Sequence, residues 1–274
     1  MVPPSLRHGI AAAVAAMVLS AALAAQSQQK PYEPSVGQAG KDAVWVPTSA
    51  AMVEKMLDQA KLTPQDFVID LGSGDGRTII AAARRGARGL GVEFNLDLVE
   101  LSRRQAAAAG VADKATFAQG DMYEADISKA TVLALFLLPS NIEKLVPKFL
   151  ALPAGTRIVA NTFWVSDWTA DETLTVQEWC ENWCTSQLFI IPAQVAGRWR
   201  VPDGMLTLSQ KFQMVEGTYA PQEGAATPVK GRLRGKAITL TVGDAEYEGT
   251  VNGGTMEGRA KTGSGARIVA TRVE

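Results

Sequence analysis

Short apolar runs alternate with amphipathic stretches through the middle of the chain, and this pattern predicts a parallel sheet with helices on both faces. The first amphipathic stretch repeats apolar residues at helical spacing behind Thr48 and Ser49, which are residue types that cap helices. Asn95 and Ser140 are expected to cap two later helices. The predicted strands are 67–71, 89–93, 115–119, 131–137 and 157–163, and the predicted helices are 48–62, 78–85, 96–109 and 141–150. Two further runs, 172–177 and 186–191, predict a terminal antiparallel hairpin and bring the expected strands to seven.

From residue 193 onward the pattern changes to short alternating runs separated by Gly, Asp, Asn and Pro, which predicts an antiparallel meander or small barrel. We treat 193–274 as a second, β-rich domain. Its expected strands are 198–201, 206–210, 213–219, 229–233, 237–242, 246–251, 255–260 and 267–272. It opens with Gly197-Arg198-Trp199, which resembles the opening of a lipocalin-like barrel over three residues only.

The first 25 residues form a segment of a different kind. Arg7 and His8 precede an apolar run that ends in the small-residue pattern Ala22-Leu23-Ala24, as in a cleaved export signal. A membrane anchor is the alternative, although 16 helical residues span only ~24 Å of a ~30 Å hydrocarbon core. Residues 26–43 are rich in Gln, Pro and Gly and are interpreted as a linker to a folded domain at 44–192.

Composition excludes several classes of function. The 274 residues are 47% hydrophobic and 20% charged, as in ordinary globular proteins. The net charge of −1 and the lack of a Lys/Arg run argue against nucleic acid as a partner. A zinc site built from Cys and His is excluded, because the only histidine lies in the first 25 residues and there are only two cysteines. Cys180 and Cys184 are either a disulfide across a tight hairpin or two reduced thiols.

The run from Phe67 to Arg77 carries the strongest chemical signal, since an apolar strand leads into the turn Gly72-Ser73-Gly74-Asp75-Gly76 and then a helix. Glycines let the backbone approach a ligand closely, and the helix start offers free amides to a polar group. A nicotinamide or flavin fingerprint would need its third glycine at position 77, which is Arg77 here.

Each of the next two strands ends in an acid. Glu93 stands 23 residues after Asp70, where a carboxylate can accept hydrogen bonds from ribose hydroxyls. Asp121 follows the third strand, where it can accept from an adenine amino group. The alternative is that both are exposed acids at strand ends.

These residues resemble motifs I, II and III of class I methyltransferases. More narrowly, Val46-Pro47-Thr48, Asp70–Gly76, Leu138-Pro139, and Phe163 with Asp167-Trp168 resemble a family that includes the mitochondrial lysine methyltransferases of ATP synthase c-subunit and adenine nucleotide translocase. The resemblance spans about 44–171 and implies a Rossmann-like seven-stranded domain that binds S-adenosylmethionine. The cofactor-binding residues expected from it are Thr48, Asp70, Gly72, Ser73, Gly74, Asp75, Gly76, Glu93, Phe94, Asp121 and Met122. The mitochondrial members lack the β-rich region and the cysteine pair.

The mechanism expected from this resemblance needs alignment more than a catalytic group. Methyl transfer is an in-line displacement by a neutral nucleophile, and a dry pocket would lower the pKa of a lysine acceptor. The expected pocket walls follow the fourth and fifth strands: Phe136, Leu138, Pro139, Phe163, Trp164 and Trp168. Packing of these aromatic residues against a neighbouring domain is the alternative.

We therefore expect an S-adenosylmethionine-dependent methyltransferase that acts on protein lysine, with a substrate that is either soluble or associated with a membrane. One alternative is a small-molecule methyltransferase, and another is a non-catalytic protein that holds an adenosine-like ligand and binds a partner through a lipocalin-like domain. The N-terminal segment predicts export to the periplasm or beyond; an anchored protein with its domain in the cytoplasm is the alternative. Export would require a source of the cofactor outside the cytosol.

Overall fold

The computed structural model describes residues 32–177, 180–261, 265 and 267–273. The segment 1–25, expected to direct export, lies outside the described residues. Within the described part of the chain, no helix is both long and apolar enough to cross a membrane. Residues 36–274 form one compact unit.

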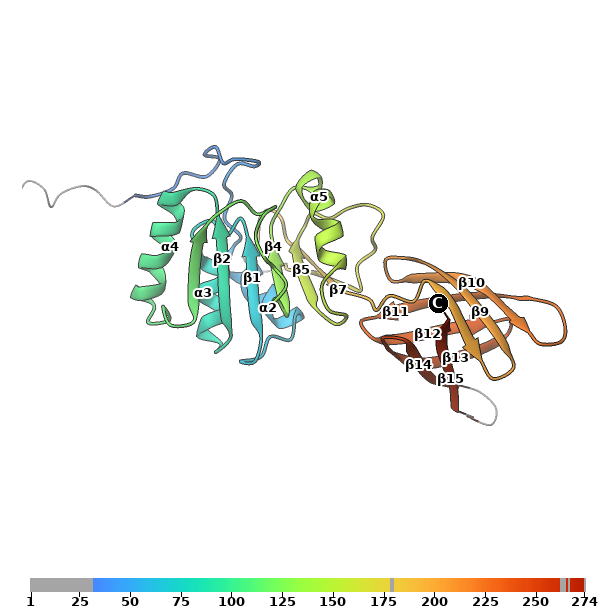
Figure 1. Ribbon diagram of the computed structural model, residues 1–274. Helices are drawn as coiled ribbons and strands as arrows, with labels where there is room; N and C mark the ends of the chain where they lie inside the picture. Colours follow the sequence, from blue (N-terminus) through green and yellow to red (C-terminus); the bar gives the residue numbers. More distant parts are fainter. Residues whose placement is uncertain (1–31, 178–179, 262–264, 266, 274) are drawn as a thin grey trace, which may run out of the picture. The chain divides into compact units, whose positions relative to one another are not determined.

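The N-terminal part of this unit contains a seven-stranded sheet with the strand order β3-β2-β1-β4-β5-β7-β6 (Figure 1). The strands are β1 (Phe67–Leu71), β2 (Arg88–Glu93), β3 (Ala115–Gln119), β4 (Val132–Leu135), β5 (Arg157–Asn161), β6 (Glu172–Thr175) and β7 (Thr185–Ile190). The first five strands are parallel, whereas β7 is antiparallel to both β5 and β6. The predicted seven-stranded α/β sheet with a terminal hairpin is confirmed.

Four helices accompany the sheet in the described residues: α2 (Ala50–Gln59), α3 (Arg77–Arg84), α4 (Leu96–Ala108) and α5 (Pro139–Leu150). Ser49 accepts a hydrogen bond from the Met52 amide and Asn95 accepts one from Asp97, so both act as the predicted caps. The expected cap at Ser140 is wrong, because α5 begins one residue earlier at Pro139. Proline starts a helix without a capping side chain, since its φ is already helical and it has no free amide.

Alternation along the strands divides the sheet's core into two layers. Val68 packs in one hydrophobic cluster with residues of α2, α3 and α4, whereas its neighbour Ile69 packs in a second cluster with α5. Successive side chains of a strand point to opposite faces, so a run that is buried on both faces is continuously apolar. Asp70 interrupts that run at the end of β1, where it is only 6% exposed.

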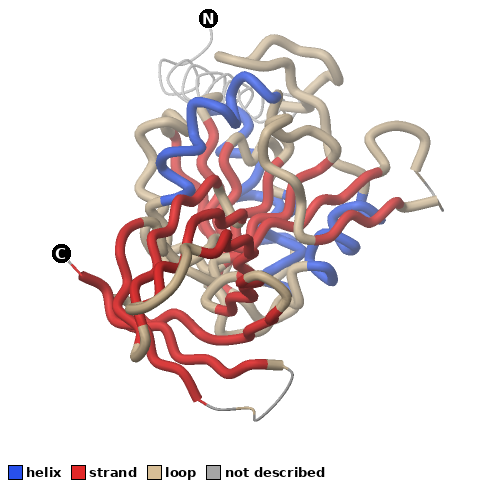
Figure 2. Tube along the Cα trace, turned by 90° about the vertical axis from the view of Figure 1, so that its right-hand side faces the viewer, coloured by secondary structure: helices blue, strands red, loops and turns tan. Residues whose placement is uncertain are grey.

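Residues from Gly197 onward form a closed antiparallel barrel of eight strands, which confirms the prediction of a small barrel. The strands are β8 (Gly197–Val201), β9 (Gly204–Lys211), β10 (Met214–Pro221), β11 (Thr227–Arg234), β12 (Ala237–Val242), β13 (Ala245–Asn252), β14 (Thr255–Ala260) and β15 (Arg267–Val273). They run as strands to the C-terminus in Figure 2. Trp199 is fully buried inside, its indole N–H donates to the Val195 carbonyl at 2.7 Å, and the Arg272 guanidinium lies 4.4 Å from its ring centre.

The two cysteines form a disulfide in the loop between β6 and β7, with their Cα atoms 5.7 Å apart. Of the two interpretations left open by the sequence, the structure supports the bridge. Both cysteines also pack against the hydrophobic cluster beneath α2, so the bridge ties this loop to the edge of the sheet.

Candidate active site

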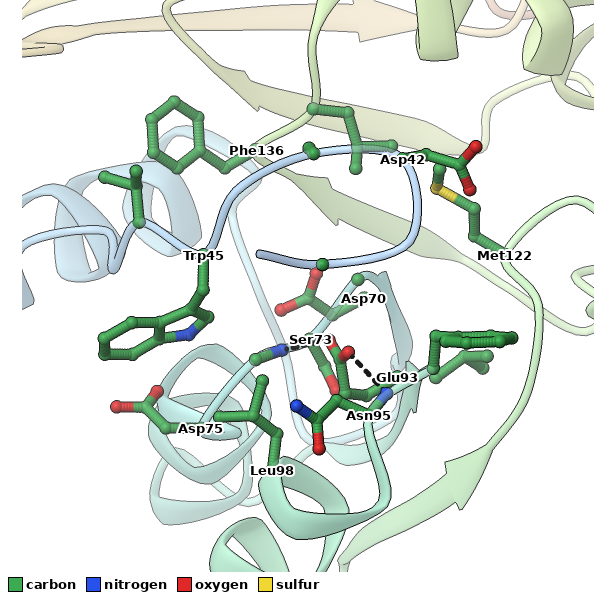
Figure 3. A pocket seen from close by; sticks show the side chains of 18 of the residues that line it. Asp42, Trp45, Asp70, Ser73, Asp75, Glu93, Asn95, Leu98, Met122 and Phe136 are labelled. Atoms are coloured by element: carbon green, nitrogen blue, oxygen red, sulfur yellow. Dashed lines mark hydrogen bonds between the residues drawn. The ribbon is translucent and has the colours of Figure 1, made fainter. Parts of the chain in front are cut away.

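A cavity of about 130 Å³ lies at the carboxyl ends of β1, β2 and β4 (Figure 3). This edge of a parallel sheet is the usual ligand site of open α/β folds. Its walls come from the glycine turn after β1, the residues after β2, β3 and β4, and the segment 38–48. Ten of the predicted cofactor-binding residues line it: Thr48, Asp70, Gly72, Ser73, Gly74, Asp75, Glu93, Phe94, Asp121 and Met122.

The turn after β1 approaches the cavity so closely that it excludes side chains. Gly74 has a φ of 56°, and a Cβ atom there would stand 2.6 Å from the indole nitrogen of Trp45. Gly76 does not line the cavity. It is the residue before α3, and a Cβ there would lie 2.7 Å from the Phe117 ring, so its role is helix-to-sheet packing.

Asp75 and Arg77 brace this turn from the side. The Arg77 guanidinium pairs with both carboxylate oxygens of Asp75, at 2.6 Å for the shortest contact, and also donates to the Thr48 carbonyl at 2.8 Å. The Val46-Pro47-Thr48 segment is thereby fastened to the glycine turn. Asp75 lines the cavity, but both its oxygens are engaged by arginine, so its role here is to hold the turn in place.

Glu93 holds the opposite side of the turn. One carboxylate oxygen accepts the Gly74 amide at 3.0 Å, and the other accepts the Asn95 amide at 2.9 Å (Figure 3). A carboxylate has about four acceptor positions, so lone pairs remain for hydroxyl groups of a ligand. Glu93 is the last residue of β2, as the sequence predicted. Its hydrogen bonds to the Gly74 and Asn95 amides, which stabilise the glycine turn, were not predicted.

Asp70 lies at the bottom of the cavity. The pKa of its carboxyl is raised to about 7, mainly because it is buried; a hydrogen bond from Thr78 opposes the rise, and the charges of Glu93 and Asp75 add to it. A buried carboxyl in this state favours any cation that enters the cavity, because a positive charge would offset both the burial and the neighbouring acids.

The segment 38–47, which the sequence analysis interpreted as the end of a linker and the start of the fold, crosses the cavity as a strap (Figure 3). Backbone hydrogen bonds between Gly37 and Trp45 and between Trp45 and Gln38 close it into a loop. The ammonium of Lys41 pairs with Asp121 and lies 5.3 Å from the ring centre of Phe94. The hydrogen bond from Lys41 holds the pKa of the Asp121 carboxyl below its ordinary value. Lys41 and Trp45 are site residues that sequence reasoning missed.

Comparison with known proteins identifies the family. Residues 70–172 match the family model described as the ANTKMT methyltransferase domain. A "Protein-lysine N-methyltransferase" from Saccharolobus islandicus (strain REY15A) is 38% identical over 137 residues, which cover 49% of this chain and 85% of that protein. The chain belongs to the ANTKMT methyltransferase family.

Other relatives agree with this assignment. The "Adenine nucleotide translocase lysine N-methyltransferase" of Mus musculus is 36% identical over 126 residues, which are 45% of this chain and 55% of that protein. A crystal structure described as an RNA methyltransferase from Salinibacter ruber in complex with S-adenosyl-L-homocysteine is 45% identical, with a TM-score of 0.52, and covers 55% of this chain and 96% of that one. This member of the ANTKMT methyltransferase family is an S-adenosylmethionine-dependent methyltransferase.

Polar atoms left over in the cavity fit such a cofactor. Among the described residues, Ser73 Oγ and Asn141 Nδ2 are buried without a hydrogen-bond partner, and both residues line the cavity of this ANTKMT-family protein. Buried polar groups are rarely left unpaired unless a ligand or water completes them. The amino-acid and nucleoside groups of S-adenosylmethionine offer partners of this kind, and Asp70 suits its cationic end.

The predicted acceptor wall is corrected in part. Phe136 lines the cavity as expected, whereas Leu138 and Pro139 do not: Leu138 precedes α5 and is 42% exposed, and Pro139 is the first residue of that helix. The continuous cavity lining of this segment ends at Leu137, because Leu138 and Pro139 already form the start of α5.

Trp164 and Trp168 do not line the cavity either. They are 8% and 2% exposed, and they pack in the cluster beneath α5. Trp164 stacks on Phe189 with ring centres 3.9 Å apart, and Trp168 stacks on Phe212 at 4.6 Å. Trp168 thus contacts the barrel part, as in the alternative of packing against a neighbouring domain, whereas Trp164 packs within the sheet domain.

A different aromatic group borders the cavity. Phe136 stacks on Phe163 with ring centres 6.0 Å apart and contacts the ring of Trp183 at 5.8 Å. Trp183 lies inside the disulfide loop, is 41% exposed, and has a φ of 55°. The disulfide loop therefore presents an aromatic side chain beside the one predicted wall residue that does line the cavity.

Proposed function

We propose that this protein is a protein-lysine N-methyltransferase. The observation that carries the proposal is the similarity to the relative of that name from Saccharolobus islandicus, which is 38% identical over 137 residues and is covered to 85% of its length. The aromatic group of Phe136, Phe163 and Trp183 supports it, because aromatic faces attract ammonium and methylated ammonium groups.

The chain's own residues have three tasks in this reaction. The glycine turn, Glu93 and Asp121 bind and orient the cofactor, which supplies a methyl group on a positively charged sulfur. The strap 38–47 and Phe136 restrict the access of water to the cavity. Apolar walls disfavour the charged form of an entering lysine, so its pKa falls and the neutral amine becomes available as the nucleophile.

Nothing in this scheme needs a covalent intermediate on the protein. Among the described residues, no cluster of acids, histidines and cysteines suits a metal ion. The methylated acceptor is formed as an ammonium, with one proton more than its neutral amine form, and it releases this proton to solvent after the transfer.

The test is a transfer assay with the purified full chain, S-adenosylmethionine labelled in the methyl group, and an extract of the source cells. We expect label in protease-sensitive material that yields methyl-lysine on acid hydrolysis. The Asp70→Asn variant is the inactive control. Label in nuclease-sensitive or low-mass material would replace lysine with RNA or a small molecule as the acceptor, and cofactor binding without transfer to any fraction would favour the non-catalytic alternative.

We further propose that residues 1–25 take the protein out of the cytoplasm, either by a cleaved signal or as a tether that would bring it close to membrane-associated substrates. The disulfide supports export, because such bridges persist in oxidising compartments. Cell fractionation with sequencing of the mature N-terminus tests this. A start near residue 26 in the periplasmic or secreted fraction is expected; an intact N-terminus in the membrane fraction would favour the anchor, and one in the cytosol would rule out both.

A further inference from the structure

The barrel contains a second cavity, of about 210 Å³, that is independent of the methyltransferase site. All of its lining residues belong to the barrel or its turns. The apolar ones are Val201, Pro202, Leu206, Ile238, Leu240, Val242, Met256, Ile268 and Ala270, and Tyr219 and Tyr247 join them.

Packing inside the barrel differs from strand to strand. Trp199 and the inward-facing Val229 and Leu233 of β11 are at most 1% exposed, so side chains fill the interior at these positions. On the neighbouring strand β12 the inward-facing positions run from buried Ile238 to partly exposed Leu240 and Val242, and Leu240 pairs with Gly231, which has no side chain. The cavity therefore lies along the inner face of β12.

The charges around the cavity are satisfied by one another. Arg259 pairs with Glu248 at 2.7 Å, and Arg267 pairs with Glu257 at 2.6 Å, on exposed positions of the strands. The hydroxyl of Tyr219 donates to the Asp203 carbonyl at 3.1 Å, which fixes one side of the rim. The cavity thus has apolar walls and no unpaired buried charge among its described lining, which favours an uncharged ligand over an ionic one.

The closed sheet also determines what can enter. Each of the eight strands is hydrogen-bonded on both sides, so no free strand edge is available for an added peptide strand. A cavity of ~150 Å³ lined by apolar side chains is known to bind benzene, so this one accommodates a somewhat larger molecule.

We propose that the barrel is a binding site for a small uncharged apolar molecule, of the size of a substituted benzene or a short isoprenoid, held between Leu240, Ile268 and Met256. This site is separate from the proposed lysine chemistry, so either can fail without the other.

The experiment is a fluorescence titration of the full chain with the neutral probe N-phenyl-1-naphthylamine, followed by displacement with p-cymene and 1-decanol. Leu240→Trp fills the cavity, and we expect it to weaken probe binding at least tenfold. Thr241→Trp is the matched control, because it adds the same side chain at the next position of β12, where the residue is exposed on the outer face. It should bind the probe as the wild type does.

Ile268→Phe adds less volume to the cavity, from a different strand of the barrel. It replaces Leu240→Trp in the titration if the Leu240→Trp protein does not unfold cooperatively. Saturable binding of one probe per chain, lost in the filled variants and kept in the control, supports the proposal. The absence of saturable binding to the wild type, undiminished binding to a folded filled variant, or binding of many probes per chain would overturn it. Binding of S-adenosylhomocysteine, measured on the same samples, is expected to be the same in all variants.

Discussion

Asp70 is a residue at which cofactor binding and the stability of the fold make opposite demands. Its carboxyl is buried at the end of an otherwise apolar strand, close to the charges of Glu93 and Asp75. Without a cation in the cavity, ionising it is costly, which is why its pKa is raised to about 7. A positively charged ligand offsets the cost of ionising the carboxyl, so its pKa falls when the ligand binds. Binding of the ligand is therefore linked to release of a proton from Asp70.

We therefore predict opposite effects of Asp70→Asn on stability and binding. Because the folded pKa is raised above the unfolded one, the carboxyl's contribution to stability is complete below pH ~4 and is lost as the pH rises through ~7. The variant lacks this loss, so its advantage in unfolding free energy over the wild type should grow from pH 4 to pH 8, to on the order of 4 kcal/mol. Urea unfolding followed by the helical circular dichroism signal measures it, since the described helices all accompany the sheet.

The same variant should bind S-adenosylmethionine more weakly, while the wild type should bind it more tightly as the pH rises from 6 to 8. Asp113→Asn, an exposed acid away from the cavity, is the control and should change neither property. An Asp70→Asn variant whose stability advantage is independent of pH would contradict the assignment of a raised pKa.

Glu93 offers a prediction about preorganisation. Glu93→Ala leaves the amides of Gly74 and Asn95 without their acceptor and removes a partner for the cofactor. We expect S-adenosylhomocysteine affinity to fall by roughly 1–3 kcal/mol, and Glu93→Gln, which retains one acceptor oxygen, to fall by less. Calorimetry on both variants measures this, and unchanged affinity in a folded Glu93→Ala protein would remove the residue from the site.

The sequence predicted the part of the site that lies within a continuous motif. Asp70, Glu93 and Asp121 are recognisable because each lies at or just after the end of a predicted strand, and parallel strands bring their carboxyl ends together. Lys41, Trp45 and Asn141 could not be found in this way, because they reach the cavity from a segment without periodicity and from the first turn of a helix. Only the three-dimensional path of the strap shows that it crosses the site.

At the scale of elements, one difference between prediction and structure falls at the cavity. The apolar run 131–137 predicted a longer strand than β4, which ends at Leu135. Phe136 and Leu137 are apolar because they line the cavity, and no sequence pattern separates a cavity wall from a buried strand. Likewise β5 ends at Asn161, where Thr162 adopts a φ of 58°. The core positions of each strand were predictable because burial on both faces leaves a continuous apolar run.

The disulfide loop between β6 and β7 supports a prediction about the acceptor. Trp183→Ala should raise the KM for the methyl acceptor several-fold and leave cofactor affinity unchanged, because its ring contacts Phe136 and not the glycine turn. Trp183→Phe retains an aromatic face and should restore most of the loss. Replacing both Cys180 and Cys184 by serine should mimic Trp183→Ala, since the loop would no longer be held. An equal fall in kcat with an unchanged acceptor KM would show that the loop acts elsewhere.

On the scale of the whole molecule, the chain carries separate hydrophobic cores. Two clusters lie on the faces of the sheet, and the third, centred on Trp199, draws its buried members from Ala193 to Ala270. Among the described residues, the sheet part and the barrel meet through the stack of Trp168 on Phe212, a hydrogen bond from Gln213 to the Thr169 carbonyl, and ion pairs such as Arg232 with Asp171. We expect the sheet part, with its two clusters, and the barrel, with the third, each to unfold as one cooperative unit.

We predict two thermal transitions that can be moved independently. S-adenosylhomocysteine should raise the sheet transition alone, since ligands stabilise the state that binds them. Trp199→Ala removes a fully buried indole and should destabilise the barrel by about 3–5 kcal/mol without changing the affinity for that ligand. Trp183→Ala is the matched control, because the same truncation at a 41% exposed position should leave both transitions near their wild-type temperatures. Scanning calorimetry distinguishes the outcomes: if Trp199→Ala lowered both transitions together, the barrel and the sheet would be one cooperative unit, and the barrel could transmit ligand binding to the methyltransferase site.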